Sequence, residues 1–426
     1  MIINLLVIGF TLFGVKEILL KHNGIESSLH WIIMAFVLGY RTFEPIPGIR
    51  LHPIEIFVYA TIIRIIIPGA IKYRKMPVVV SLISIFYVTF FFIDMLTRYN
   101  LIVVNEFKNT FLMIVIFFIT QHIRFNKIYM IQLFKSYLIS ASLISILGIV
   151  EFLFPSFMST IFGFENEVGS MSAGPLFSRL AFLYWGSHLA ANLISPIFPI
   201  LLLLKAEKDP IAKNNYFLTL LVIINLFAIY LSGNRISWLI LTILLLATIF
   251  QYRSSLIPYM KTYALLLTMV FVAYVYSQPV EGRYISTFKA LTGNIDARYD
   301  SSGSVRMSRA NIAIKSIINQ PLGTGWSSQG WVHSDILQIA ATIGIIPGFL
   351  LFFAPMLLLL RIFSFYLKAP PDQQTIYFCL CGFLIYIIIS LCLNGNIILV
   401  QCGAPLFLLW AISDGFINSY NQIRSI

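Results

Sequence analysis

The sequence is short of charge. Of its 426 residues, 29 are Lys or Arg and 17 are Asp or Glu, so charged side chains make up 11% and hydrophobic ones 59%. Soluble proteins carry about 25% charged residues. So few charges cannot cover a surface in water without exposing contiguous apolar patches. A soluble enzyme, a nucleic-acid-binding domain and a disordered scaffold are therefore excluded, and the composition predicts a polytopic membrane protein.

Cysteine and metal-binding patterns are equally scarce. The four Cys lie in apolar C-terminal stretches, at 379, 381, 392 and 402, without Cys-x-x-Cys spacing. This placement predicts buried free thiols. There is no Asp-x-Asp and no His/carboxylate set at ligand spacing, so we expect neither a metal nor another cofactor. The net charge of +12 comes from short basic clusters between apolar segments, which is typical of membrane topology and does not favour nucleic acid as a partner.

Apolar segments long enough to approach a bilayer-crossing helix recur along the chain. They are 2–20, 28–44, 54–71, 77–96, 109–122, 130–154, 176–204, 216–231, 235–250, 258–277, 336–360, 375–393 and 396–418. Because open sheets cannot lie in hydrocarbon, the sequence predicts an all-α membrane protein of about 12–13 transmembrane helices. Thirteen crossings place the N-terminus outside. If either 2–20 or 28–44 enters the membrane without crossing it, the count is 12 and both termini are cytoplasmic.

The basic connections orient these helices. Those near 72–75, 124–127, 205–213, 253–261 and 361–368 fall on one side, which the positive-inside rule assigns to the cytoplasm. The opposite face then carries one long loop. We therefore expect transmembrane helices over 1–277, a periplasmic loop over 278–335 and C-terminal transmembrane helices over 336–426.

The long loop is basic and partly helical. Its periodicity predicts an amphipathic helix over 305–319, with Met307, Ala310, Ile314 and Ile317 on one face and Arg306, Arg309 and Lys315 elsewhere. Pro321–Gly325 then predicts a turn.

Basic residues on the outer side of a membrane protein are unexpected, and anion binding explains them most simply. Arg235 follows Ser232–Asn234 at a helix start, where free backbone N–H groups also favour an anion. Arg179 lies at another outer helix end. His333 lies at a helix mouth beside the basic loop, where an imidazole could act as a base near pH 7. Contact with lipid headgroups or pairing with acids in the loop is the alternative for each Arg.

In this order the motifs resemble those of the O-antigen ligase and Wzy polymerase family of bacterial envelope enzymes. The matching stretches are Ser232–Trp238, Arg306, Pro321–Gly325, His333-Ser334 and Gly344–Gly348, the last with one extra residue. The helix from Arg179 to Pro199 is similar to the family's central helix, with Gly186-Ser187-His188 where many polymerases read Glu-Pro-Ser-His. The resemblance covers about 176–360.

The resemblance implies a GT-C-like glycosyltransferase in the bacterial inner membrane, acting at its periplasmic face on undecaprenyl-pyrophosphate-linked oligosaccharide. Arg235 and Arg306 would stabilise the leaving pyrophosphate and His333 would orient or deprotonate the acceptor hydroxyl. The substrate-binding residues would be Arg179, Arg309, His188 and Ser334. Membrane lipids and a chain-length regulator are further expected partners.

The Ser187-His188 pair and the weak match before residue 170 favour a polymerase, which joins repeat units, over a ligase, which transfers the glycan to lipopolysaccharide core. A transporter of lipid-linked oligosaccharide is the remaining alternative, although two related halves are not evident. Glu44, in an early outward turn, is an alternative base or a partner of Arg41 or Arg50, and His188 is alternatively a hydrogen-bonding residue between helices.

Overall fold

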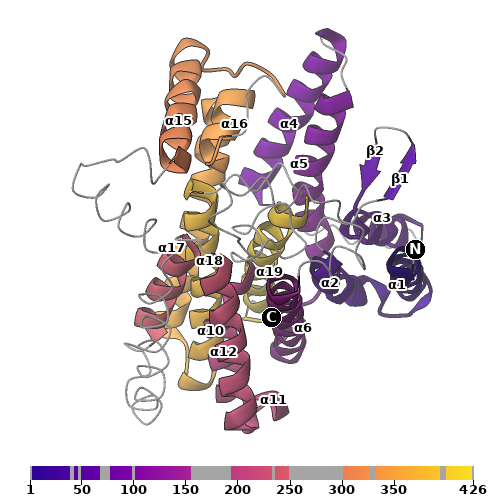
Figure 1. The fold of residues 1–426 in the computed structure, drawn as a ribbon, viewed down its shortest axis with the longest axis vertical. Coiled ribbons are helices and arrows are strands. Elements are labelled where there is room, and N and C mark those ends of the chain that lie inside the picture. Colours follow the sequence, from indigo (N-terminus) through magenta and orange to yellow (C-terminus); the bar gives the residue numbers. More distant parts are fainter. Residues whose placement is uncertain are drawn as a thin grey trace.

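The computed structural model (Figure 1) is helical apart from one short hairpin in the part of the chain that it describes. That part comprises residues 2–38, 43–46, 49–67, 77–97, 101–154, 193–232, 236–248, 301–326, 332–393 and 400–424.

The N-terminal region consists of three helices and the hairpin. Helices α1 (Ile2–Leu20) and α2 (Gly24–Ala35) are followed by the 3-10 turn η1 (Phe36–Leu38), and antiparallel strands β1 (Phe43–Ile46) and β2 (Ile49–Leu51) lead into α3 (Pro53–Ile66). The expected span 28–44 is therefore shorter, because its helical part ends at Leu38 and strand β1 begins at Phe43. Helix α3 begins sharply because Pro53 fits the first helical turn and His52 caps it.

Three long helices follow. They are α4 (Val78–Thr97), α5 (Leu101–Thr120) and α6 (Lys127–Leu153). The expected start of the second, at 109, is wrong by eight residues. The helix includes the charged residues Glu106 and Lys108, and the side chain of Lys108 pairs with Glu55 of α3.

The central region packs against α6. Helices α10 (Ile197–Ala206), α11 (Pro210–Lys213) and α12 (Asn215–Ser232) are followed by the apolar helix Ile236–Thr248. Asn225 of α12 joins this region to α6: its Oδ1 accepts from Ser145 Oγ at 2.8 Å and its Nδ2 donates to Ser142 Oγ at 3.2 Å. Such buried interhelical hydrogen bonds hold apolar helices in register.

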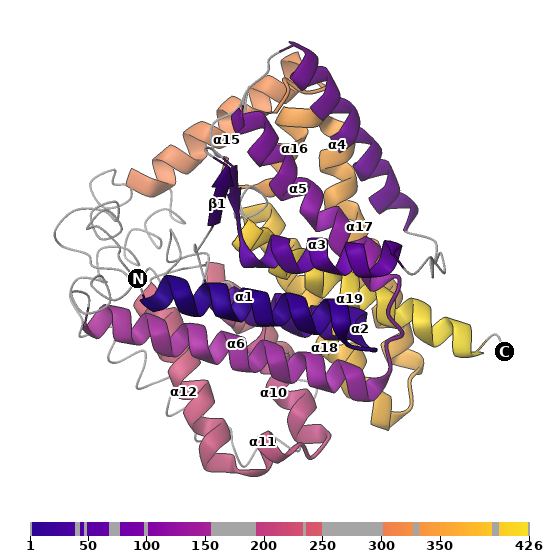
Figure 2. The ribbon, with the colours of Figure 1, turned by 90° about the vertical axis from the view of Figure 1, so that its right-hand side faces the viewer.

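The C-terminal region begins with α15 (Ser301–Asn319), which confirms the predicted amphipathic helix with a start four residues earlier. It continues with α16 (Asp335–Ile343), α17 (Ile345–Lys368), α18 (Pro371–Leu393) and α19 (Val400–Arg424). The expected span 336–360 is thus two helices, because Gly344 adopts φ +112° and breaks the helix. In Figures 1 and 2 α15 lies against α16 at the periphery of the molecule.

Five of these helices are long and apolar enough to cross a membrane: Val78–Thr97, Val103–Thr120, Lys127–Glu151, Ile345–Lys368 and Gln373–Leu393. Four shorter apolar helices accompany them, and one contiguous apolar core joins the N-terminal, central and C-terminal regions. The chain is therefore a polytopic membrane protein. Cys379, Cys381 and Cys392 are free thiols, as predicted, and the first two are buried.

Candidate functional site

The turn after α15 is docked on the C-terminal end of α16. Thr324 N donates to Ala341 O at 3.0 Å and Gly325 N donates to Thr342 O at 2.8 Å. Ile345 N, at the start of α17, donates to Pro321 O at 2.9 Å. The last carbonyls of a helix lack partners within it. Here the turn supplies them, so the Pro321–Gly325 motif fixes how α15 meets α16.

Glycine is required at this junction by conformation and by space. Gly323 has φ +95°, and a Cβ there would lie 2.5 Å from Thr342 O. Gly344 has φ +112°, and a Cβ there would lie 3.1 Å from Leu322 O. Only glycine adopts such φ values without strain. The two motifs that carried the family resemblance, Pro321–Gly325 and Gly344–Gly348, are therefore two halves of one structural unit.

Trp326 ties this unit to α4 and α5. Its backbone N–H donates to Asp94 Oδ2, and both residues are buried. Its ring packs edge-on against Tyr87, with ring centroids 5.5 Å apart, and against Phe107 at 6.2 Å. Sequence reasoning missed Asp94. A charged residue inside an otherwise apolar segment was the available signal, because such residues are costly unless they have a partner.

The start of α16 carries two of the predicted site residues. Ser334 is the N-cap, and its Oγ accepts from Leu337 N at 3.4 Å. Gln338 Oε1 accepts from Val332 N at 2.8 Å, which fixes the chain immediately before the cap. These contacts hold the backbone on both sides of His333. Ser334, predicted to bind substrate, thus has a structural role as a cap.

His333 lies in a positive field. Burial, followed by the positive charges of Arg306 and Arg309, lowers the pKa of His333 to about 4. The imidazole is therefore neutral at pH 7 and can accept a proton. The structure thus brings together three of the predicted site residues, two from α15 and one from the mouth of α16.

The remaining predicted site residues cannot be placed in this arrangement. Arg179, His188 and Arg235 lie outside the described residues. Glu44, the alternative base, belongs to strand β1.

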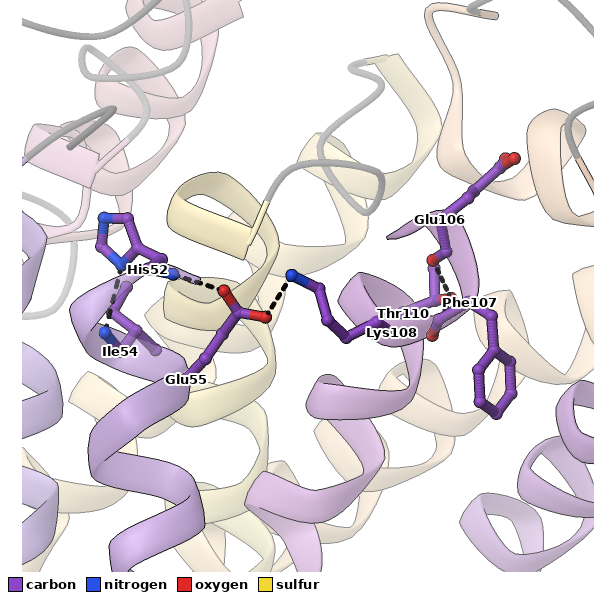
Figure 3. Close-up of polar contacts among 7 residues, drawn as sticks. All are labelled: His52, Ile54, Glu55, Glu106, Phe107, Lys108 and Thr110. Atoms are coloured by element: carbon purple, nitrogen blue, oxygen red, sulfur yellow. Dashed lines mark hydrogen bonds and ion pairs between the residues drawn. The ribbon is translucent and has the colours of Figure 1, made fainter. Parts of the chain in front are cut away.

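A second polar cluster lies between α3 and α5 (Figure 3). Lys108 Nζ is 2.9 Å from Glu55 Oε1, and the Glu55 side chain is almost wholly buried. The other carboxylate oxygen accepts from the backbone N–H of His52, whose Nδ1 in turn accepts from Ile54 N at 3.1 Å. Glu106, two residues from Lys108, points away from the pair in Figure 3. Glu55 is thus a paired structural acid.

Metal-binding groups are not evident in the parts of the chain that the structure describes, where no three His, Cys, Asp or Glu side chains converge. The chemistry available around His333 is that of a neutral base beside two fixed cations. No known protein family and no curated protein matches this chain.

Proposed function

We propose that the chain is a glycosyltransferase that joins repeat units carried on undecaprenyl pyrophosphate, as a surface-polysaccharide polymerase of the bacterial inner membrane. The reaction would take place at the periplasmic face. The observation that carries this proposal is that Arg306 and Arg309 lie close enough to His333, at the start of α16, for their charges to keep it neutral. The order of the sequence motifs supplies the substrate class.

In the proposed step, the hydroxyl oxygen of one sugar attacks the anomeric carbon of a lipid-linked glycan. A glycosidic C–O bond forms, the bond from the anomeric carbon to the pyrophosphate oxygen breaks, and the lipid pyrophosphate leaves with the electron pair. His333 takes the proton of the attacking hydroxyl. Arg306 and Arg309 stabilise the charge that builds on the pyrophosphate, because fixed cations need no reorganisation during the reaction.

The electrostatics of the site couple these two roles. While the arginine charges act on the imidazole unopposed by substrate, a pKa of about 4 makes His333 a weak base. A bound pyrophosphate brings negative charge to the same place and raises that pKa. His333 thus becomes a stronger base when the donor is present, which is when the attacking hydroxyl must lose its proton.

The test is complementation of a bacterial strain that lacks the gene, with surface glycan displayed as a ladder on a gel. We expect His333→Ala, Arg306→Ala and Arg235→Ala to leave lipopolysaccharide core bearing a single repeat, at normal expression. Lys315→Ala is the matched control, since Lys315 is an exposed cation of the same helix. Full ladders from all three site variants would overturn the proposal. A null strain with bare core and long chains on the carrier lipid would identify a ligase.

A further inference from the structure

Helix α15 uses a narrow face to pack against α16. Ala313 is buried there with Ala341 and Val332, and Ile317 is partly buried beside them. Because Ala313 and Ala341 are small, the two helices approach closely. The predicted apolar face of α15 is therefore divided, and only part of it contacts the rest of the protein.

The other part forms an exposed apolar stripe. It consists of Met307, Ile314, Ile318 and Leu322, whose side chains are 63%, 42%, 72% and 74% exposed. The first three recur at intervals of seven and four residues, which places them on one side of the helix. The sequence predicts one apolar face that contains Met307, Ala310, Ile314 and Ile317. In the structure Ile317 lies beside α16, whereas Met307 and Ile314 are exposed.

All the charged side chains of α15 are basic. Helix α15 contains Arg306, Arg309 and Lys315 and no Asp or Glu. Arg309 and Lys315 are both exposed. A helix with an apolar stripe whose only charges are cations on its other sides is typical of the interface of an anionic membrane.

The stripe is also continuous with the apolar exterior of a membrane-crossing helix. Leu322 lies next to Gly344, since its carbonyl oxygen is 3.1 Å from the position of a Cβ there. Helix α17 begins at the next residue, and its first turns expose Ile345, Ile346 and Phe349. This helix is one of the five that are long and apolar enough to cross a bilayer. The exposed apolar surface at the start of α17 therefore adjoins the end of α15.

We propose that α15 lies in the headgroup region of the bilayer, with Met307, Ile314, Ile318 and Leu322 in contact with lipid. The partner is the membrane surface itself. The opposite edge of the same helix carries Arg306 and Arg309, so the anchored helix holds these cations at the level of lipid headgroups. The inference rests on the packing of α15 and not on the proposed transfer reaction, so it can fail while that reaction stands.

The experiment is spin-label accessibility in the full-length protein. A nitroxide is attached to a single cysteine at Ile314→Cys or Ile318→Cys, with Ser308→Cys, an exposed position about 100° around α15 from Met307, as the matched control. The protein is reconstituted in vesicles of phosphatidylcholine and phosphatidylglycerol. Collision with oxygen, which concentrates in lipid, is compared with collision with a water-soluble nickel chelate. We expect oxygen to dominate at 314 and 318 and nickel to dominate at 308.

Two results would overturn the proposal. Nickel collisions as frequent at 318 as at 308 would show that the stripe faces water. Low collision rates with both reagents at 318 would show that protein covers it, either another part of the chain or a second copy. The three positions are exposed, so the substitutions leave the core intact, and background labelling is measured on the unaltered chain and subtracted. A variant that is not monodisperse is replaced by Leu322→Cys, which tests the same contact.

Discussion

Two polar sites in this apolar protein use charge in opposite ways. Between α3 and α5, a buried carboxylate meets one ammonium group at 2.9 Å, and the charges of Glu55 and Lys108 cancel. At the mouth of α16, two guanidinium groups act on one imidazole, and both push its pKa in the same direction. In the first arrangement opposite charges meet, whereas in the second two positive charges act on the same imidazole.

The comparison separates structural from functional charge. A buried ion pair gives little net stability, but removing one partner strands the other in a medium that solvates it poorly. Two positive charges that lie close together repel each other and so lower stability. A bound anion reduces that repulsion, so such an arrangement favours anion binding. We therefore expect substitutions at the two sites to separate stability from activity.

The largest effect on stability is expected at the α3–α5 pair. Lys108→Ala leaves the buried carboxylate of Glu55 without its cation and should cost about 3–5 kcal/mol, the usual range for breaking a buried pair. The loss is measured as a lower melting temperature of the purified protein in detergent. Activity per folded molecule should not change.

The control for this prediction is an exposed pair of the same type. Lys127 Nζ lies 2.8 Å from Glu207 Oε1, with both side chains partly accessible. Lys127→Ala should cost less than about 1 kcal/mol, as exposed pairs do. Equal losses from Lys108→Ala and Lys127→Ala would show that burial does not distinguish the two pairs.

The reverse pattern is expected at His333. His333→Ala should lower the rate of glycan transfer about 100-fold or more, the usual contribution of a positioned general base. The melting temperature should change little, because the side chain is only partly buried. Transfer is measured with purified protein and a lipid-pyrophosphate-linked repeat unit. A variant with full activity would remove His333 from the mechanism and leave the arginines as its only candidates.

A smaller effect on both properties is expected at the junction that supports the site. Gly323→Ala places a Cβ against Thr342 O at a φ of +95° and should cost about 1–3 kcal/mol. Because the turn fixes α15 on α16, the arginines should also move relative to His333 and transfer should slow. Gly9→Ala is the control, since a Cβ at Gly9 meets nothing within 4 Å. A loss of stability without any loss of transfer would show that the turn does not position the arginines.

Much of the helical architecture could be predicted from the sequence, because hydropathy alone marks segments such as 77–96 and 375–393. The errors fall where charge or glycine overrides hydropathy. The predicted start at residue 109 leaves out Lys108, whose partner Glu55 is distant in the chain. Gly344 was read as part of a motif inside one span, because a positive φ has no signature in hydropathy.

The candidate site stays a prediction, and the structure bears only on where some of its residues lie. The residue types and their order indicated Arg306, Arg309 and His333, and the structure brings them together. The clamp between Asp94 and Trp326 could not be predicted, because it joins residues 232 positions apart through a backbone N–H. Which apolar residues of α15 are buried and which are exposed depends on the side that α16 covers. Helical periodicity does not specify that side.

The smallest and most specific effect is a shift in pH dependence. A pKa of about 4 lies below the ordinary value of 6.5, so protonation of His333 disfavours the native site. Its contribution to stability is complete above pH 6.5 and falls as the pH drops from 6.5 toward 4. Arg309→Ala removes one source of the shift, so the pKa of His333 should rise and the acid limb of kcat/KM should move to higher pH.

This shift in the acid limb is the most specific test of the comparison between the two sites, because it reports the electrostatic potential at the His333 imidazole. The acid limb of kcat/KM belongs to the free enzyme, and that of kcat belongs to the complex with donor. In the wild type the limb of kcat should lie at higher pH, since bound pyrophosphate offsets the arginines. Lys315→Ala should leave both limbs in place. If Arg309→Ala also leaves them in place, the titrating group is not His333, and the positive field at α16 has a different purpose.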